Sequence, residues 1–390
     1  MEEFDQVGAA AERDALVDVP LVGDLAGLHR RRLGHQQGTG GVGRGAAALA
    51  GLLEQLDTHR FEVIAYSNRP EHKTDAMSQR LRAHCAGWKN IDGLDDVAAA
   101  GLIHADGIHI LLDLAGHTGD NRLPLFACKP APVQAAWLGY FATTGVEQMD
   151  YLIGDPNVCP AGEEGHFTET IWRLPETYLC FTPPDADIAI NDLPARENGF
   201  ITFGCFNNIG KLTDAVLATW ARILQQVPNA RLLLKARQLA DAAVCTWLRE
   251  RFAAYGITDQ QLLLEGPTPR DDYLRAYQRL DIVLDPFPYP GGTTTVEALW
   301  MSVPVLTLRG NRMLSHAGEN IMRNVGLPEW IAVDEADYVT KAVEFAADPD
   351  MLATLRQQLR QQALASPMFD APRFARHFEN ALSGMWSAKR

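Results

Sequence analysis

The residues best suited to bind an anion follow an apolar run in the C-terminal half. That run ends at Asp285, and a Pro-rich turn leads to Gly291, Gly292 and the threonines Thr293 to Thr295. Glycines let backbone approach a ligand, and a helix that begins here would offer free N–H groups and a partial positive charge. The pattern indicates a diphosphate site, with Glu297 placed to bind a ribose. A capped helix after a tight turn would also explain it.

A second polar group follows the strand predicted from Phe200 to Phe206. It contains Asn207, Asn208 and Lys211. A lone lysine is usually solvated, but this one follows a strand whose end should share a sheet edge with the glycine-threonine turn. An ammonium group there would neutralise charge on a departing nucleotide diphosphate, and would take the place of a metal ion.

A third group lies between Asp106 and Thr118 and contains His109, Asp113 and His117. His109 falls inside a buried strand, where a structural role is favoured. His117 follows the strand beside a glycine, so we expect it to face a cleft.

Two other motifs carry little weight. The sequence Gly38–Gly43 fits the G-x-G-x-x-G dinucleotide pattern, but no strand precedes it. Asp185 and Asp187 resemble a D-x-D metal motif but fall in a predicted linker. We therefore expect neither a dinucleotide nor a metal site.

Composition limits the classes of protein that this chain can be. Its 390 residues are 47% hydrophobic and 22% charged, enough for two or three domains with sizeable cores. The formal net charge of −14 argues against a general nucleic-acid binder. Six widely spaced cysteines fit a reducing cytoplasm, and no apolar run suits a membrane span.

Apolar strands alternate with helical segments twice along the chain, which predicts an α/β fold of two Rossmann-like lobes with parallel sheets facing a cleft. Residues 49–181 would form an incomplete N-terminal lobe and residues 182–198, rich in prolines and acids, a linker. Residues 199–390 would form the C-terminal lobe with its terminal helices. Residues 1–48 read as an atypical, poorly ordered segment.

Several stretches resemble the catalytic region of the family-41 glycosyltransferases, the O-GlcNAc transferase and SPINDLY family. They include ADGIHILLDLAGHT, MDYLIGDP, NGFITFGCFNNIGKLT and LDPFPYPGGTTTVEALWMSVPVLTL, in family order from about Phe61 to the C-terminus. The wording NGFITFGCFNN and LPETYLCFTPP is closer to the SPINDLY branch. The resemblance implies a GT-B fold and an inverting sugar transfer to Ser or Thr hydroxyls of proteins.

The resemblance also implies roles for individual residues. Lys211 would hold the leaving diphosphate. His117, chosen from its position after the strand, is the second catalytic candidate beside Lys211. The remaining implied residues are Asn208 at the donor phosphates, Arg270 beside the base, Gly291, Gly292, Thr293, Thr294 and Thr295 at the diphosphate, Glu297 on the ribose, and Leu138 and Gly139 lining the sugar site. Gly292 replaces a histidine and Gly210 an aromatic of the O-GlcNAc transferases, which leaves the donor sugar open.

The N-terminal segment departs from the family pattern. Members open this lobe with a strand and a segment that carries an Asp and a His, whereas here the text is LGHQQGTGGVGRGAAA, with His35 the nearest histidine. The TPR repeats that usually come first are also missing. We therefore expect residues 1–48 not to encode the family's first β-α unit, so that the lobe lacks a strand.

The resulting prediction is a cytoplasmic glycosyltransferase that moves GlcNAc from UDP-GlcNAc to a protein acceptor, with no metal or other cofactor. Alternatives are a protein O-fucosyltransferase that uses GDP-fucose, and a nucleotide-sugar-binding protein that has lost catalysis. A two-lobed epimerase is a further rival, with Asp113 and His117 as its acid/base pair. No nucleic-acid or membrane partner is expected.

Overall fold

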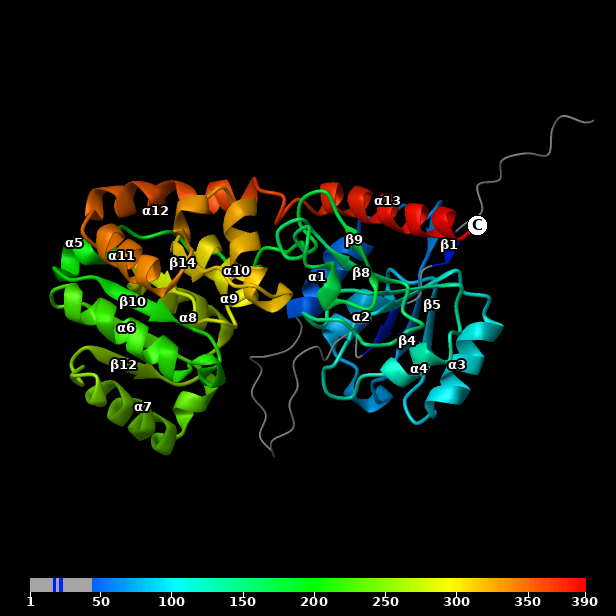
Figure 1. Ribbon diagram of the computed structural model, residues 1–390, viewed down its shortest axis with the longest axis horizontal. Helices are drawn as coiled ribbons and strands as arrows, with labels where there is room; N and C mark the ends of the chain where they lie inside the picture. The colour runs from blue at the N-terminus through cyan, green and yellow to red at the C-terminus, as the bar shows by residue number, and fades with distance from the viewer. Residues whose placement is uncertain (1–16, 19–20, 24–43) are drawn as a thin grey trace, which may run out of the picture.

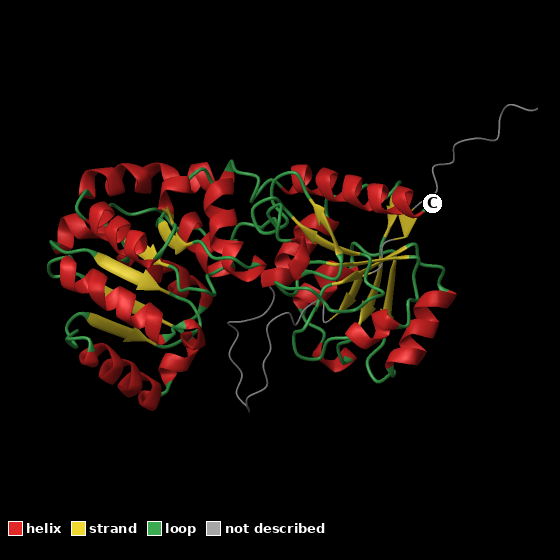
Figure 2. Cartoon of the chain, in the orientation of Figure 1, coloured by secondary structure: helices red, strands yellow, loops and turns green. Residues whose placement is uncertain are grey.

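Two lobes lie side by side in the computed structural model, which describes residues 17–18, 21–23 and 44–390 (Figure 1). Each lobe has a sheet with helices against it (Figure 2). Every strand pairing in the two large sheets is parallel. The predicted α/β fold with two parallel sheets is confirmed.

The N-terminal lobe is built on a seven-stranded sheet in the order β5-β4-β2-β6-β7-β8-β9. The strands are β2 (Leu21–Gly23), β4 (Ile64–Ser67), β5 (Gly87–Asn90), β6 (Ile110–Asp113), β7 (Val133–Ala136), β8 (Tyr151–Gly154) and β9 (Thr170–Arg173). The strands β1 (Val17–Asp18) and β3 (Phe61–Glu62) form a separate pair. The helices are α1 (Arg44–Leu53), α2 (Ala76–Arg82), α3 (Asp96–Ala105) and α4 (Leu123–Ala127).

The expectation that this lobe lacks a strand is wrong. Strand β2, from the segment set aside as atypical, lies between β4 and β6 in the middle of the sheet, with Leu21 in register with Ala65 and Leu112. Three residues suffice because both neighbours bond to them. The other predictions for this segment were poor order of residues 1–48 and the motifs at His35 and Gly38–Gly43. Apart from the ranges named above, they concern residues that lie outside the described part of the chain.

The C-terminal lobe has a six-stranded sheet in the order β12-β11-β10-β13-β14-β15. Its strands are β10 (Thr202–Cys205), β11 (Arg231–Lys235), β12 (Leu262–Glu265), β13 (Ile282–Leu284), β14 (Val305–Leu308) and β15 (Ile331–Ala332). Its helices are α5 (Pro194–Asn198), α6 (Asp214–Gln226), α7 (Ala242–Ala254), α8 (Arg270–Arg275), α9 (Thr293–Trp300), α10 (Met313–Asn324), α11 (Glu335–Ala346) and α12 (Pro349–Leu364).

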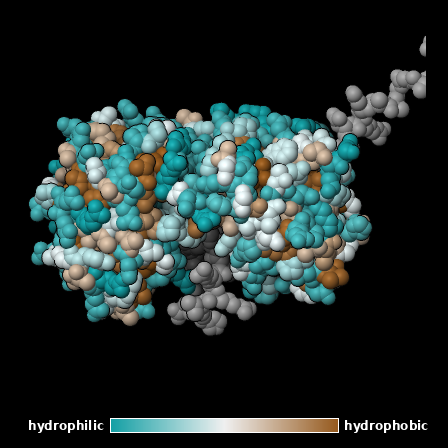
Figure 3. Space-filling view, in the orientation of Figure 1, coloured by the Kyte–Doolittle hydropathy of each residue, from teal (hydrophilic) through white to brown (hydrophobic). Residues whose placement is uncertain are grey.

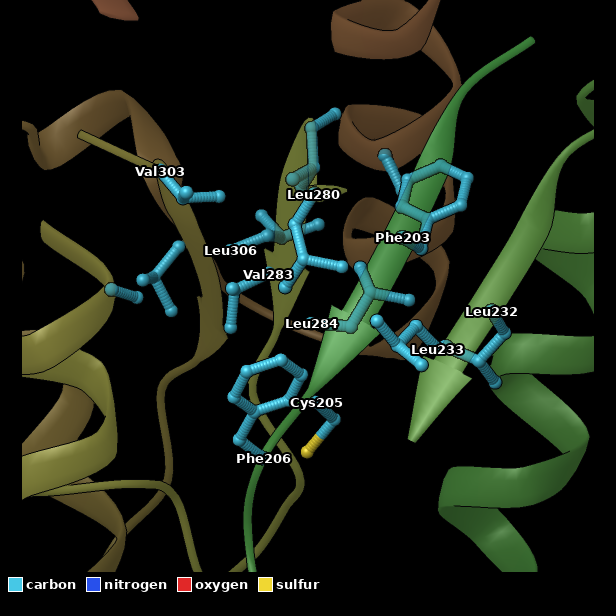
Figure 4. Packing of buried hydrophobic residues seen from close by; sticks show 14 of the residues in the cluster. Phe203, Cys205, Phe206, Leu232, Leu233, Leu280, Val283, Leu284, Val303 and Leu306 are labelled. Carbon is cyan, nitrogen blue, oxygen red and sulfur yellow. The ribbon is translucent and has the colours of Figure 1, made fainter. Parts of the chain in front are cut away.

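The core of the C-terminal lobe lies on both sides of the central strand β10, which pairs with β11 and β13. Side chains of the three strands meet there: Phe203, Cys205, Leu232, Leu233, Val283 and Leu284 (Figure 4). Because both faces of these strands are buried, the sequence reads as continuous apolar runs and not as an alternation. The loops that follow β10 and β13 therefore leave the same edge of a rigid sheet.

The predicted domain boundaries need two corrections. The linker predicted at residues 182–198 includes α5, and its Ile188 and Leu193 are buried in the core of the C-terminal lobe. The last helix, α13 (Ala371–Lys389), packs in the core of the N-terminal lobe through Phe374, Phe378 and other apolar residues. Figure 1 shows this helix lying along the N-terminal lobe, after the chain has crossed over from α12.

Helix α10 carries the polar contacts that join the lobes. Its buried His316 lies with Nε2 at 3.1 Å from Glu163 Oε1 of the N-terminal lobe, and with Nδ1 at 3.3 Å from Glu319 Oε2. Asn157 also donates to Asn320, at 3.2 Å. Hydrogen bonds to Glu319 and Glu163 raise the pKa of His316 above its usual 6.5. A protonated imidazole between two carboxylates therefore connects the lobes.

This arrangement predicts a pH-dependent stability. Because the folded pKa of His316 is raised, its contribution is fully present below its ordinary pKa and is lost as pH rises through the raised value. We expect His316→Gln to lower the thermal midpoint more at about pH 6 than at about pH 9. The exposed His104 of α3 supplies the control His104→Gln. An equal loss at both pH values would contradict this role for His316.

Candidate functional site

The turns that follow β10 and β13 meet at one side chain, the buried Asn207. Its Oδ1 accepts hydrogen bonds from Lys211 Nζ at 3.0 Å and from Thr294 Oγ1 at 3.1 Å. Lys211 is the last residue of a short 3-10 helix (Ile209–Lys211), and Thr294 lies in the first turn of α9. The structure thus brings together the lysine and the threonine that the sequence analysis placed at one sheet edge.

The Lys211 ammonium is enclosed by protein groups. It also donates to the carbonyl oxygen of Pro290 at 2.7 Å, and it lies 3.9 Å from the centre of the Tyr289 ring. Burial lowers the pKa of Lys211, and the nearby Asp285 opposes that effect. The result is a desolvated cation beside the start of a helix, where an anion is stabilised strongly.

Asp285 holds the glycine-threonine turn through hydrogen bonds. Its Oδ1 accepts from the backbone N–H of Gly291 at 2.6 Å, and the Thr295 hydroxyl lies 3.4 Å from both of its oxygens. Gly291 and Thr295, both predicted to bind the donor diphosphate, therefore hold the turn through Asp285. The half-buried Gly292, Thr293 and Thr294 form the part of the turn that can meet a ligand.

The two glycines of the turn differ in the space around them. A Cβ at Gly291 would lie 2.3 Å from Thr295 Oγ1 and 2.9 Å from Asp285 Oδ1, which no real side chain tolerates. A Cβ at Gly292 would meet nothing within 4 Å. Gly292 caps α9 with no side chain, so the space above the helix start stays open.

The predicted ribose and base residues contact each other. Glu297 is buried, and its Oε1 lies 2.7 Å from Arg270 Nη1 while its Oε2 accepts from Tyr273 at 3.0 Å. Tyr277 in turn donates to the carbonyl of Thr294 at 3.1 Å, which ties this group to the turn. Arg270 and Glu297 therefore lie on the same side of α9, as a nucleoside site requires.

Asn208, predicted to lie at the donor phosphates, is held by neighbouring protein groups. Its Oδ1 accepts from the Gly210 N–H at 2.8 Å and from Gln238 Nε2 at 2.6 Å, and its side chain is exposed. It is the preceding Asn207 that contacts Lys211 and Thr294. Sequence reasoning also missed Tyr289 and Tyr273, although both are aromatic residues next to predicted site residues.

The N-terminal lobe contributes a second group at the edge of the first sheet. His117 Nε2 lies 3.0 Å from the Thr143 carbonyl, and its ring meets that of Tyr140 edge-on at 5.2 Å. A carbonyl only accepts, so Nε2 carries the proton and Nδ1 of the neutral ring is left as an acceptor.

Leu138 lines a small hollow between the lobes, and Gly139 follows it in the chain. The hollow is lined by Gly116, Leu138, Tyr140, Thr144 and other residues of the N-terminal lobe, together with Met313 of α10. Leu138 has a positive φ of 73°, and a Cβ at Gly139 would lie 2.2 Å from the Leu114 carbonyl oxygen. The chain there is tightly bent, which turns this segment towards the other lobe.

Asp113 is an anchor for this loop. It is buried and accepts from the N–H groups of Ala115 at 3.0 Å and Gly116 at 2.8 Å. Burial raises its pKa to about 6. With both oxygens bonded to backbone, Asp113 holds the segment that carries His117 and is badly placed for the acid/base exchange of an epimerase.

The two lobes are further linked at the site by Tyr289 and Phe141, whose rings lie 6.3 Å apart at 66°. The surface over both lobes is mainly hydrophilic with scattered apolar residues (Figure 3). Within the described part of the chain, no three His, Cys, Asp or Glu side chains come together to hold a metal ion. Among those same residues, none of the helices is long and apolar enough to cross a bilayer.

Two lobes with parallel α/β sheets, and a glycine-threonine turn at a strand end, define a protein of the two-lobed GT-B class. The sequence matches the model of glycosyl transferase family 41 over residues 47–182 and 191–378. The chain therefore belongs to glycosyl transferase family 41, as predicted.

Named relatives agree with that placement. The chain is 38% identical to a probable UDP-N-acetylglucosamine–peptide N-acetylglucosaminyltransferase SPINDLY of Arabidopsis thaliana, over 86% of this chain and 37% of the relative. The SPINDLY of Solanum lycopersicum is 36% identical, over 86% and 36%. The chain thus spans little more than a third of these curated relatives.

Solved structures are similar as well. A mutant O-GlcNAc transferase of Thermobaculum terrenum has a TM-score of 0.86 and 35% identity, over 97% of this chain and 69% of that one. The sucrose-phosphate synthase of Thermosynechococcus elongatus has a TM-score of 0.60 at 14% identity, over 95% of this chain and all of that one, and shares the fold alone. The predicted GT-B fold is confirmed.

The contrast between the two glycines yields a prediction about the turn. Gly291→Ala should destabilise the fold by about 1–3 kcal/mol, because its Cβ overlaps Thr295 and Asp285. Gly292→Ala, the matched control, should change the free energy of unfolding by less than about 0.5 kcal/mol. Urea denaturation of both variants measures this, and similar losses in the two would mean that the turn is built differently.

Proposed function

We propose that this chain transfers a sugar from a nucleotide sugar to Ser or Thr hydroxyls of proteins, with GlcNAc from UDP-GlcNAc as the donor. The observation that carries the proposal is the shared contact of Lys211 and Thr294 with Asn207, beside the open start of α9. The printed names of the SPINDLY relatives support the choice of donor and acceptor.

In this reaction the donor's diphosphate lies at the start of α9. The unbonded N–H groups of the first helical turn and the Lys211 ammonium stabilise the negative charge that develops as the sugar bond breaks. The ammonium must exchange one of its protein contacts for the diphosphate. We propose the face covered by Tyr289, since a cation–π contact contributes only about 0.5–2 kcal/mol.

The nucleoside of the donor lies beside Glu297 of α9 and Arg270. Glu297 accepts hydrogen bonds from the ribose in place of Tyr273 or Arg270, and Arg270 then faces the base. Glu297 is buried, so both of its carboxylate oxygens must still accept a hydrogen bond after the ribose replaces a protein partner. This requirement favours a ligand that carries two adjacent hydroxyls.

The acceptor hydroxyl approaches from the N-terminal lobe. His117, with Nδ1 as the free acceptor of its neutral ring, removes the proton as the hydroxyl attacks the sugar. Leu138, together with Met313 of the C-terminal lobe, lines the hollow near this loop, and we propose that Leu138 and Gly139 border the sugar there. The positive charge needed at the leaving group is supplied by Lys211 and the helix start, so we propose that no metal ion or other cofactor takes part.

Replacement of the lysine tests this proposal. Lys211→Ala should lower sugar transfer by about 10²–10³-fold, because it removes the charge that stabilises the leaving diphosphate. Its thermal midpoint should stay near that of the unchanged protein. Lys341→Ala, whose side chain bonds to the Glu329 carbonyl on the same lobe, is the matched control. Near-normal transfer by Lys211→Ala would rule out the proposed role.

Binding measurements distinguish the possible donors, and comparison with transfer assays shows whether binding leads to catalysis. Calorimetric titration with UDP, GDP and their sugars should give the tightest binding for the UDP ligands. Tighter binding of GDP and GDP-fucose would support the protein O-fucosyltransferase alternative. Binding of a nucleoside diphosphate with no transfer to any acceptor would support a binding protein without catalysis.

A further inference from the structure

Asp285 contacts the glycine-threonine turn of the proposed diphosphate site, and it also contacts Asn207, which holds Lys211. It follows β13 at the carboxyl edge of the sheet and is completely buried. On one side it holds the backbone N–H of Gly291 and the hydroxyl of Thr295. On the other side Asn207 Nδ2 lies 3.5 Å from its Oδ1.

The hydrogen bonds of Asn207 connect this carboxylate to the ammonium of Lys211. Asn207 turns its amide nitrogen towards Asp285, so its Oδ1 is directed at Lys211 and Thr294. If the amide flipped, its NH₂ group would face two donors. The charge on Asp285 thus fixes the orientation of the amide, and the amide fixes the ammonium.

A buried carboxylate is costly, and its surroundings show why it is kept. Burial raises the pKa of Asp285 to about 6, while the Gly291 N–H, Lys211 and the two threonines Thr295 and Thr307 oppose that rise. The group is therefore ionised at neutral pH in spite of its burial. A neutral side chain of the same shape would hold the turn with less cost to stability.

We propose that Asp285 is a positioning residue that anchors the Gly291–Thr295 turn and, through Asn207, orients the ammonium of Lys211 beside it. The inference rests on the proposed function, because it assigns Lys211 to the donor diphosphate. Asp285 is bonded to the Gly291 N–H and lies near the hydroxyls of Thr295 and Thr307. It acts on the donor through the turn and through Lys211.

The other titratable groups near the pair stay uncharged at neutral pH. Burial raises the pKa of the Cys205 thiol to about 12, and it raises the pKa of the Tyr338 phenol, which donates to the Asp285 carbonyl. Gly318 of helix α10 also faces Asp285 and has no side chain. A Cβ added to Gly318 would lie 3.2 Å from Asp285 Oδ2. Tyr289 covers the ammonium with its ring face. Asp285 therefore supplies the negative charge that Lys211 meets.

The test is the pH dependence of UDP binding by the full chain. Binding should weaken at alkaline pH as Lys211 loses its proton. In Asp285→Asn that weakening should begin at a lower pH than in the unchanged protein, because the ammonium has lost its neighbouring charge. Thr307→Val removes one bond to Asp285, at 3.3 Å, but leaves the carboxylate, and should keep the pH profile of the unchanged protein.

The outcomes separate the two proposals. If the unchanged protein fails to bind UDP, the proposed function is wrong. If it binds UDP but Asp285→Asn has an unshifted profile, Asp285 is structural and this inference is overturned. A shift in Thr307→Val equal to that in Asp285→Asn would overturn it too, because loss of packing would then explain both.

A measurement on the unchanged protein covers the case in which Asp285→Asn does not fold. The Lys211 side-chain signal, observed with ¹³C-labelled lysine and identified by its loss in Lys211→Arg, is followed against pH. It should show an inflection near pH 6, where Asp285 takes up its proton. A Lys211 signal that is flat through that range would contradict the coupling.

Discussion

One amide oxygen joins the two halves of this site. Oδ1 of Asn207 accepts from Lys211 and from Thr294, so the turn after β10 and the turn after β13 are held in one geometry. The strands bring these turns together, since parallel neighbours end at the same edge of a sheet. The bond from Lys211 to the Pro290 carbonyl is a second link between the ammonium and the turn that leads into α9.

The site edge is built from buried carboxylates in both lobes. Asp113 at the end of β6, Asp155 after β8 and Asp285 after β13 each accept from backbone N–H groups of the following loop. Burial raises the pKa of each to about 6. Since these folded pKa values exceed the usual 3.8, ionisation costs stability as pH rises from that value to about 6. The loops are thereby fixed at the expense of the fold's stability.

Local patterns in the sequence predicted much of this arrangement. The runs that form β10 and β13 are apolar throughout, and the lysine and threonines follow at the ends of two strands of one sheet. Sequence reasoning assigned no role to Asn207 in particular, because both faces of β10 are buried. Side chains alternate along a strand, and Asn207 continues the side of Cys205, which its amide contacts at 3.6 Å. Strand β2 and the docking of α13 depend on contacts with distant residues, which no local pattern records.

The proposed function depends on a single diphosphate site made by Lys211 and the start of α9. A crystal structure of this chain with UDP bound tests it most directly. The account predicts a phosphate oxygen within hydrogen-bonding distance of Lys211 Nζ, another at the N–H groups of Thr293 and Thr294, and the ribose at Glu297. A UDP molecule bound elsewhere, with the Lys211 ammonium still on Pro290 and under the Tyr289 ring, would contradict it.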